Sequence, residues 1–179
     1  MKILLDHSLE PPATYCWRNE WRSPYDSIHN LLSKFAYLNT MSARHIAQLF
    51  LAYNTGYRTR SIKGLNISLL DSKHFEDELL AELFEIEVDK IIKAFPYPHY
   101  DQLEFPANRK LRFCLKCMAK GFHATIYQLD IIARCPIHGC DLIDECPQCE
   151  SSIPYTLHPK WFNDPYYCPT CHLDLAPIV

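Results

Sequence analysis

The feature that most constrains this chain is a set of eight metal-type ligands arranged in four short pairs. Two residues separate the ligands within every pair, a spacing that lets a tight turn aim two side chains at one tetrahedral ion. The pairs are Cys114 and Cys117, Cys135 and His138, Cys146 and Cys149, and Cys168 and Cys171. The last three pairs begin with Cys-Pro, which indicates one turn design used repeatedly.

The gaps between the pairs predict how they combine. Seventeen residues separate the first pair from the second and eighteen separate the third from the fourth, both within the range of paired zinc knuckles. Only seven residues separate the second pair from the third. We therefore expect two consecutive zinc ribbons with sequential pairing, one site with three Cys and one His and the other with four Cys. A crossed pairing is the alternative, and the possible substitute ligands are Cys140, the rival of His138, and His123, His158 and His172.

The metal is expected to be structural. Catalytic zinc keeps an open coordination position and usually has a general base nearby. Neither set of four ligands shows a vacancy, and the ligand pairs contain neither a His-x-Glu nor a His-Glu-x-x-His pattern. We expect two structural zinc ions, no enzymatic activity, and a ribbon region that unfolds on chelation.

The cysteine content also bears on the compartment. Nine cysteines among 179 residues would suggest disulfides in a secreted protein, but the paired spacing and an N-terminus unlike a signal peptide favour a reducing compartment. No uncharged apolar run approaches the roughly 18 residues that a membrane helix requires. We expect a soluble cytoplasmic protein without a membrane partner.

The N-terminal half carries helical patterns. Ser23 and Asp26 predict the start of a helix whose apolar residues recur at helical spacing: Ile28, Leu31, Leu32, Phe35 and Leu38. After the break at Asn39-Thr40, Ser42 can cap a second helix that ends at 54–56. Two further helices are expected at about 72–84 and 88–95. The first two helices and their short turn fit a helix-turn-helix, and they fit any small bundle equally well.

Prolines at 96, 98 and 106 predict a stiff connection between two parts of the chain, because proline fixes its own φ and restricts the residue before it. We place the domain boundary there. The predicted domains are a helical, helix-turn-helix-like domain at 1–106 and a double zinc-ribbon domain at 107–179. The predicted fold class is mainly α, with small β elements in the ribbons.

Charge is distributed unevenly along the chain. The net charge of −3, with His neutral, disfavours nucleic acid as a partner unless a local basic patch exists. Residues 71–90 hold eight acids and two lysines, so the remaining chain is weakly positive. Two segments without acids are candidate nucleic-acid contacts: Arg58, Arg60 and Lys63 in the first, and Arg109, Lys110, Arg112, Lys116 and Lys120 in the second. A solvated basic surface is the competing interpretation of both.

The residues between the ligands carry a resemblance to a known family. Cys-Leu-Lys-Cys at 114–117 is followed by Gly-Phe-His at 121–123, Gln-Leu at 128–129, Cys-Pro-Ile-His-Gly at 135–139 and Cys-Pro-Gln-Cys at 146–149. This order of motifs resembles that of the TniQ family of transposition proteins, most densely from Cys114 to Tyr155. The likeness extends more loosely upstream to the Leu-Asn-Thr-Met-Ser turn at 38–42.

The resemblance implies a non-catalytic target-selection adaptor of a transposon, with an N-terminal helix-turn-helix region and zinc ribbons. Such proteins connect a target, recognised as DNA or through a guide-RNA complex, to the AAA+ ATPase of the transposon. The same eight ligands are implied. Longer members append further DNA-binding domains, so we expect either a short member or a fragment. The alternative function is a stand-alone DNA-binding regulator built from zinc ribbons and a helix-turn-helix.

Overall fold

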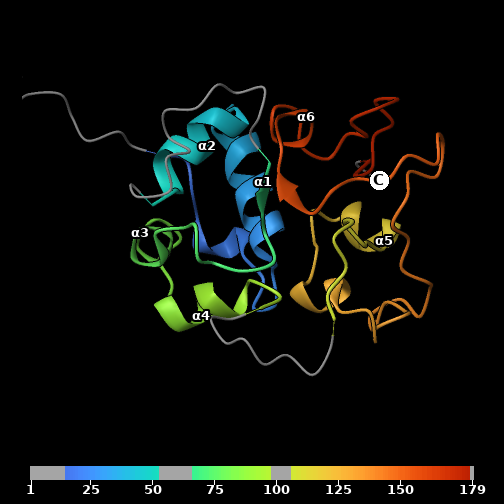
Figure 1. Ribbon diagram of the computed structural model, residues 1–179, viewed down its shortest axis with the longest axis horizontal. Helices are drawn as coiled ribbons and strands as arrows, with labels where there is room; N and C mark the ends of the chain where they lie inside the picture. The colour runs from blue at the N-terminus through green and yellow to red at the C-terminus, as the bar shows by residue number, and fades with distance from the viewer. Residues whose placement is uncertain (1–14, 53–65, 98–105, 178–179) are drawn as a thin grey trace, which may run out of the picture.

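The computed structural model describes residues 15–52, 66–97 and 106–177. The first two ranges form a helical half, and residues 106–177 form a ribbon half that lies beside it (Figure 1). The elements in chain order are η2 (Asn19–Trp21), α1 (Ile28–Leu38), α2 (Ala43–Phe50), β1 (Ile67–Ser68), α3 (Asp77–Leu83), α4 (Val88–Lys93), α5 (Leu115–Met118), η5 (Thr125–Gln128), β2 (Thr156–Leu157) and α6 (Pro159–Phe162).

The helix α1 begins at Ile28, one turn later than the cap predicted at Ser23. Its N-cap is Ser27, whose hydroxyl accepts a hydrogen bond from the Asn30 N–H at 3.1 Å. Asp26 instead accepts hydrogen bonds from the Ser23 N–H at 2.9 Å and from Lys34 Nζ at 2.9 Å. These contacts hold residues 23–26 in a turn before the helix, so the predicted start at Ser23 is wrong.

The second helix confirms its predicted cap. Ser42 Oγ accepts from the His45 N–H at 3.4 Å, and His45 Nδ1 accepts from the Ser42 N–H at 3.4 Å, which together form a capping box. Thr40, with φ of 49°, makes the turn from α1. The helix ends at Phe50, and its predicted end at 54–56 lies outside the described residues.

The helices α3 and α4 form the pair predicted for the acidic segment, although both are shorter than predicted. α3 starts at Asp77 rather than near Ser72, because residues 72–76 form a turn closed by a 2.7 Å hydrogen bond from the Phe75 N–H to the Ser72 carbonyl. α4 runs from Val88 to Lys93. Val88 lies on the surface at the start of this helix.

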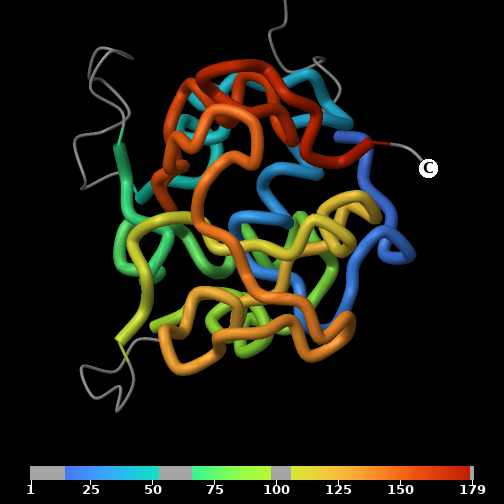
Figure 2. The backbone as a smooth tube through the Cα atoms, turned by 90° about the vertical axis from the view of Figure 1, so that its right-hand side faces the viewer, coloured from blue at the N-terminus to red at the C-terminus, as the bar shows by residue number. Residues whose placement is uncertain are grey.

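One hydrophobic core joins the two halves. It includes apolar residues of α1 to α4 together with residues of the ribbon half: Leu111, Phe113, Met118, Ile153, Tyr155, Leu157, Trp161, Phe162, Tyr166 and Leu175. β1 pairs with β2 in an antiparallel two-stranded sheet, with Ile67 opposite Leu157 and Ser68 opposite Thr156. In Figure 2, which faces the ribbon half, the chain after residue 106 lies in front of the helical half. The boundary predicted at 106/107 therefore does not separate two hydrophobic cores.

The described residues form a mainly helical protein with a small sheet and hairpin turns in the ribbon half, as the sequence predicts for the coarse fold class. None of the helices within the described ranges is long and apolar enough to cross a membrane.

Candidate metal centres

The first centre consists of Cys114, Cys117, Cys135 and His138, whose donor atoms all lie within 4.8 Å of one another. The Sγ atoms of Cys117 and Cys135 are 3.7 Å apart. His138 Nδ1 lies 3.5, 3.2 and 3.6 Å from the sulfurs of Cys114, Cys117 and Cys135. A tetrahedral zinc ion with its usual bond lengths would separate two sulfurs by about 3.8 Å and a sulfur from a nitrogen by about 3.6 Å. The four donors therefore fit a tetrahedral ion of this size.

The second centre consists of Cys146, Cys149, Cys168 and Cys171, again with all donor atoms within 4.8 Å. Cys146 Sγ lies 3.6 Å from Cys171 Sγ, and Cys149 Sγ lies 3.6 Å from Cys168 Sγ. These separations also match a tetrahedral site with four thiolates. The structure therefore groups the first pair with the second and the third with the fourth, which is the predicted sequential order. Both clusters can hold a metal ion.

The last three pairs each adopt the same kind of backbone turn. This common turn explains their shared Cys-Pro start. In each turn the first ligand's N–H donates to the carbonyl five residues later: Cys135 to Cys140, Cys146 to Ser151 and Cys168 to Leu173, at 2.8 to 2.9 Å. The residue directly before the accepting one has a positive φ in all three turns. These residues are Gly139, Glu150 and His172. The first pair differs, because Cys114 is the N-cap residue of α5.

Two of these turns favour the thiolate form of their first cysteine, Cys135 in one and Cys168 in the other. Burial opposes ionisation of Cys135, but hydrogen bonds from the Tyr127 hydroxyl and from backbone N–H groups of the turn outweigh it and lower the pKa of Cys135 to about 6. Burial likewise opposes ionisation of Cys168, but hydrogen bonds from backbone N–H groups outweigh it and lower the pKa of Cys168 to about 6. In contrast, burial raises the pKa of Cys114 to about 12. In the second centre, a hydrogen bond from the Ser151 hydroxyl also lowers the pKa of Cys149. A lowered pKa favours the thiolate, which is the form that binds a metal ion.

Three further side chains lie against the ligands. The Tyr127 hydroxyl is 3.1 Å from Cys117 Sγ and 3.4 Å from Cys135 Sγ. Cys140 Sγ is 3.4 Å from Cys114 Sγ but outside the four-donor group. In the second centre, Ser151 Oγ is 3.0 Å from Cys149 Sγ. Ligand spacing identified Cys140 as a rival ligand, whereas no local pattern distinguishes Tyr127 or Ser151 from other polar residues.

The other substitute ligands have different roles. His158 caps α6, since its Nδ1 accepts from the Lys160 N–H at 3.1 Å. His172 Nδ1 lies 3.6 Å from an Asp164 carboxylate oxygen. His123 is completely buried and accepts at Nδ1 from the Ser27 hydroxyl at 2.7 Å, while its Nε2–H donates to the Arg112 carbonyl at 2.8 Å. None of the three belongs to either cluster.

Two residues of the Gly-Phe-His and Gln-Leu motifs hold the ribbon half in place. His123 links α1, through Ser27, to the strand-like segment at Arg112. The buried Gln128 amide donates to the carbonyls of Asn108 and Lys110 at 3.1 and 2.8 Å and accepts from the Arg112 N–H at 2.8 Å. These motif residues therefore position the first centre and its link to the helical half.

The basic residues around the first centre divide into two groups. Lys110 is paired with Asp144 at 3.5 Å and Glu145 at 3.3 Å. The Arg112 guanidinium is only 11% exposed and donates to the carbonyls of Leu129 at 2.8 Å and Ile132 at 2.7 Å. Both side chains are thus used within the fold. Arg109, Lys116 and Lys120 are exposed and have no ion pair with any described residue.

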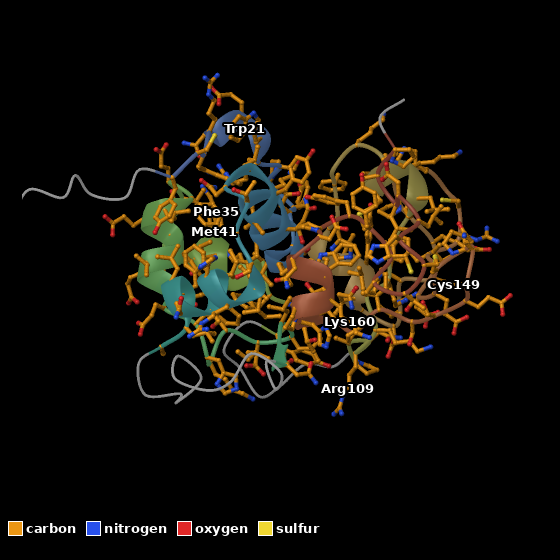
Figure 3. All side chains as sticks on the ribbon, turned by 90° about the horizontal axis from the view of Figure 1, so that it is seen from above. Trp21, Phe35, Met41, Arg109, Cys149 and Lys160 are labelled. Atoms are coloured by element: carbon orange, nitrogen blue, oxygen red, sulfur yellow. The ribbon has the colours of Figure 1, made fainter. Side chains whose placement is uncertain are left out.

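Arg109 extends away from the molecule at the edge of the view in Figure 3, while Cys149 lies in the ribbon half away from Phe35 and Met41. The predicted nucleic-acid contacts Arg58, Arg60 and Lys63 lie outside the described residues.

Comparison of the chain with protein-family models gives no match, and comparison with curated proteins also gives none.

Proposed function

We propose that the chain is a non-catalytic adaptor that holds two structural zinc ions and connects a nucleic-acid target to a protein partner. The observation that carries this proposal is the pair of four-donor clusters at tetrahedral spacing, each with its full set of ligands and one beside a group of unpaired cations. Four protein donors leave no position for substrate, which is typical of structural zinc. Because thiolate ligands require a reducing compartment, the proposal includes a cytoplasmic location.

The finer proposal is a target-selection protein of a transposon, of the kind that the motif order resembles. In this role the protein links target DNA, or a guide-RNA complex, to an AAA+ ATPase encoded by the same transposon. The resemblance supports it through the residues from Cys114 to Tyr155. Several of them, including His123, Tyr127 and Gln128, are buried around the first centre.

The nucleic-acid contact is proposed at Arg109, Lys116 and Lys120, which we call the free cation group. Lys116 lies on α5, within the first ligand pair, and Lys120 follows that helix directly. Basic side chains on a rigid turn can hold a phosphate backbone without reading its sequence. Lys110 and Arg112 are omitted from this group because their charged ends already have intramolecular partners.

The protein partner is proposed to meet the acidic surface of α3 and α4. Glu82, Glu85, Glu87 and Asp89 belong to this surface, and Asp89 pairs with Lys93, four residues later on α4, at 2.8 Å. An acidic surface repels nucleic acid and attracts a basic protein surface. The two proposed contacts would then use opposite charges on different halves of the molecule.

A binding experiment tests the proposal. The zinc-loaded protein should bind target DNA or the guide-RNA complex in shift assays and retain the AAA+ ATPase in pull-downs. Reversal of the free cation group to Glu should abolish nucleic-acid binding, and the wild-type affinity should fall steeply with salt, by about 0.9 in the logarithmic slope per phosphate contacted. The matched control reverses three exposed lysines of the helical half: Lys73, Lys90 and Lys93. Failure to bind nucleic acid and ATPase alike would reject the proposal.

A stand-alone DNA-binding regulator is the second candidate. The observation that favours it is the exposed face of α2, which carries Arg44, His45 and Gln48. Arg and Gln are side chains that read guanine and adenine edges in the major groove. This function predicts a sequence-specific footprint without any transposon partner, and Arg44→Ala and Gln48→Ala should relax its specificity. An adaptor without sequence preference would leave no such footprint.

A further inference from the structure

We propose that Cys140 and Cys114 form a peroxide-sensitive disulfide site that opens the first metal centre. The inference rests on the proposed occupancy of that centre by zinc, and it assigns a chemical role to the one thiol beside the centre that is not among its four donors. The oxidant is a hydroperoxide, either hydrogen peroxide or an organic one. The second centre should not respond in this way.

The position of Cys140 carries the inference. Its Sγ lies 3.4 Å from Cys114 Sγ, so formation of a disulfide bond requires an approach of roughly 1.4 Å. Cys140 is partly exposed, whereas Cys114 is buried. A small oxidant can therefore reach the thiol outside the four-donor group, and the resulting sulfur faces a ligand sulfur.

The backbone keeps the two cysteines together. Phe113 and Ile143 exchange two backbone hydrogen bonds, at 2.8 and 3.0 Å, which fixes the segment just before Cys114 against the segment just after Cys140. The Cys140 carbonyl also accepts from the Cys135 N–H at 2.8 Å. The two sulfurs are thus held close to each other within one hairpin.

The reaction balances with hydroperoxide as the only oxidant. Cys140 Sγ gives its proton to solvent and attacks one peroxide oxygen, the O–O bond breaks, and Cys140 becomes a sulfenic acid while hydroxide or alkoxide leaves and takes up a proton. Cys114 Sγ then attacks the Cys140 sulfur, its bond to the metal breaks, the S–S bond forms and hydroxide leaves to take a proton from water or buffer. Two thiols lose two electrons, and the peroxide gains them. Three donors remain at the first centre, which weakens its hold on the ion.

The second centre provides an internal control. Cys140 and Ser151 occupy the same place in the repeated turn, two residues after the second ligand of their pairs, and both carbonyls accept from the first ligand's N–H. Where the first centre has a thiol beside its ligands, the second has the Ser151 hydroxyl, 3.0 Å from Cys149 Sγ. A hydroxyl cannot form a disulfide. The two centres therefore differ at one atom, the sulfur of Cys140 and the oxygen of Ser151, and we expect peroxide to open only the first.

Zinc release from the full chain tests the inference. The protein is loaded with zinc, its metal content is measured, and hydrogen peroxide is added in the presence of a chromophoric zinc indicator. The wild type should release one ion per chain with the kinetics of Cys114–Cys140 disulfide formation, which mass spectrometry of blocked peptides follows. Cys140→Ser should slow that release roughly tenfold or more, because the paired thiol is lost. Cys16→Ser, which removes the exposed cysteine outside both centres, should behave as the wild type does.

The reciprocal variant strengthens the design. Ser151→Cys should make the second centre release its ion as well. Equal rates of release from the wild type and Cys140→Ser, or a disulfide that excludes Cys140, would overturn the inference while leaving the metal centres intact. A chain that holds fewer than two zinc ions before peroxide is added would instead overturn the proposed centres themselves. The metal content measured at the start distinguishes the two failures.

Discussion

At the scale of single residues, Arg112 shows how a cation next to a metal-binding turn can be used inside the fold. Its guanidinium donates to two carbonyls in the segment between the first two ligand pairs, Leu129 and Ile132, and lies 4.0 Å from an Asp130 carboxylate oxygen. The two terminal nitrogens of the planar guanidinium each donate to one of these carbonyls. Arg112 therefore fixes the loop that brings Cys135 to Cys114.

Arg112→Met is expected to lower the free energy of unfolding by roughly 2 to 3 kcal/mol, because it removes charge-assisted hydrogen bonds from a nearly buried site. Urea denaturation at saturating zinc measures this change. Arg109→Met is the matched control, since Arg109 is exposed and its substitution should change stability by no more than about 0.5 kcal/mol. Equal effects of the two variants would show that the loop does not depend on Arg112.

Gly139 has a positive φ of 66° in the turn that carries the second ligand pair, Cys135 and His138. A Cβ added there would meet no atom within 4 Å, so the cost of Gly139→Ala comes from the backbone alone. This cost should be about 1 to 2 kcal/mol, and Gly139→Asn should cost less because Asn tolerates this conformation. Thermal unfolding with both centres saturated measures the difference. A larger loss for Asn than for Ala would contradict the backbone explanation.

At the scale of elements, the parts that could be predicted are those whose partners are close in sequence. The Ser42 cap depends on residues within one turn and is confirmed, and the four predicted ligand pairs, each also within one turn, lie in two clusters that can hold a metal ion. The start of α1 was wrong because Asp26 is held by more than its local turn: it also binds Lys34 and forms a β-bridge with Ala124 in the ribbon half. The internal role of Arg112 depends likewise on carbonyls 17 and 20 residues away.

The contact between α1 and the ribbon half contains two buried histidines. His29 and His123 have ring centroids 5.7 Å apart, and His29 also packs against Tyr155, Trp161 and Phe162. Burial, together with the charge of its neighbour His123, holds the pKa of His29 well below its usual value. Burial likewise lowers the pKa of His123 to about 4. Both rings are therefore neutral in the folded protein near pH 7.

These histidines predict a loss of stability in acid. The unfolded chain has histidines with pKa near 6.5, so it binds more protons than the folded chain as the pH falls below that value. Their stabilising contribution is complete above about pH 6.5 and is lost as the pH falls towards 4. His29→Phe should reduce the slope of stability against pH in this window, measured by urea denaturation with the zinc content checked at each pH. An unchanged slope would assign the acid sensitivity to the metal ligands.

At the scale of the whole molecule, the two halves depend on each other. The shared core, the pairing of β1 with β2 and the 2.9 Å hydrogen bond from Trp161 Nε1 to Ser33 Oγ all cross between them. The sequence predicted a boundary from prolines, which report local stiffness. Proline positions carry no information on whether apolar faces on either side pack together, so the shared core could not be predicted from them.

Removal of the metal should therefore unfold both halves together. A bound ion stabilises a hairpin that is too small to be held by apolar packing alone. A strong chelator should therefore unfold the ribbon half. Ile153, Tyr155, Leu157, Trp161 and Phe162 then leave the core, and α1 loses the packing that the ribbon half supplies. Hydrogen exchange measured by mass spectrometry should show peptides from 28–38 and from 143–162 losing protection at the same chelator concentration. Cys168→Ser, which weakens only the second centre, should lower that concentration without separating the two transitions. If the α1 peptides kept their protection after the ribbon peptides had lost theirs, the helical half would be an independent domain, as the predicted boundary at 106/107 requires.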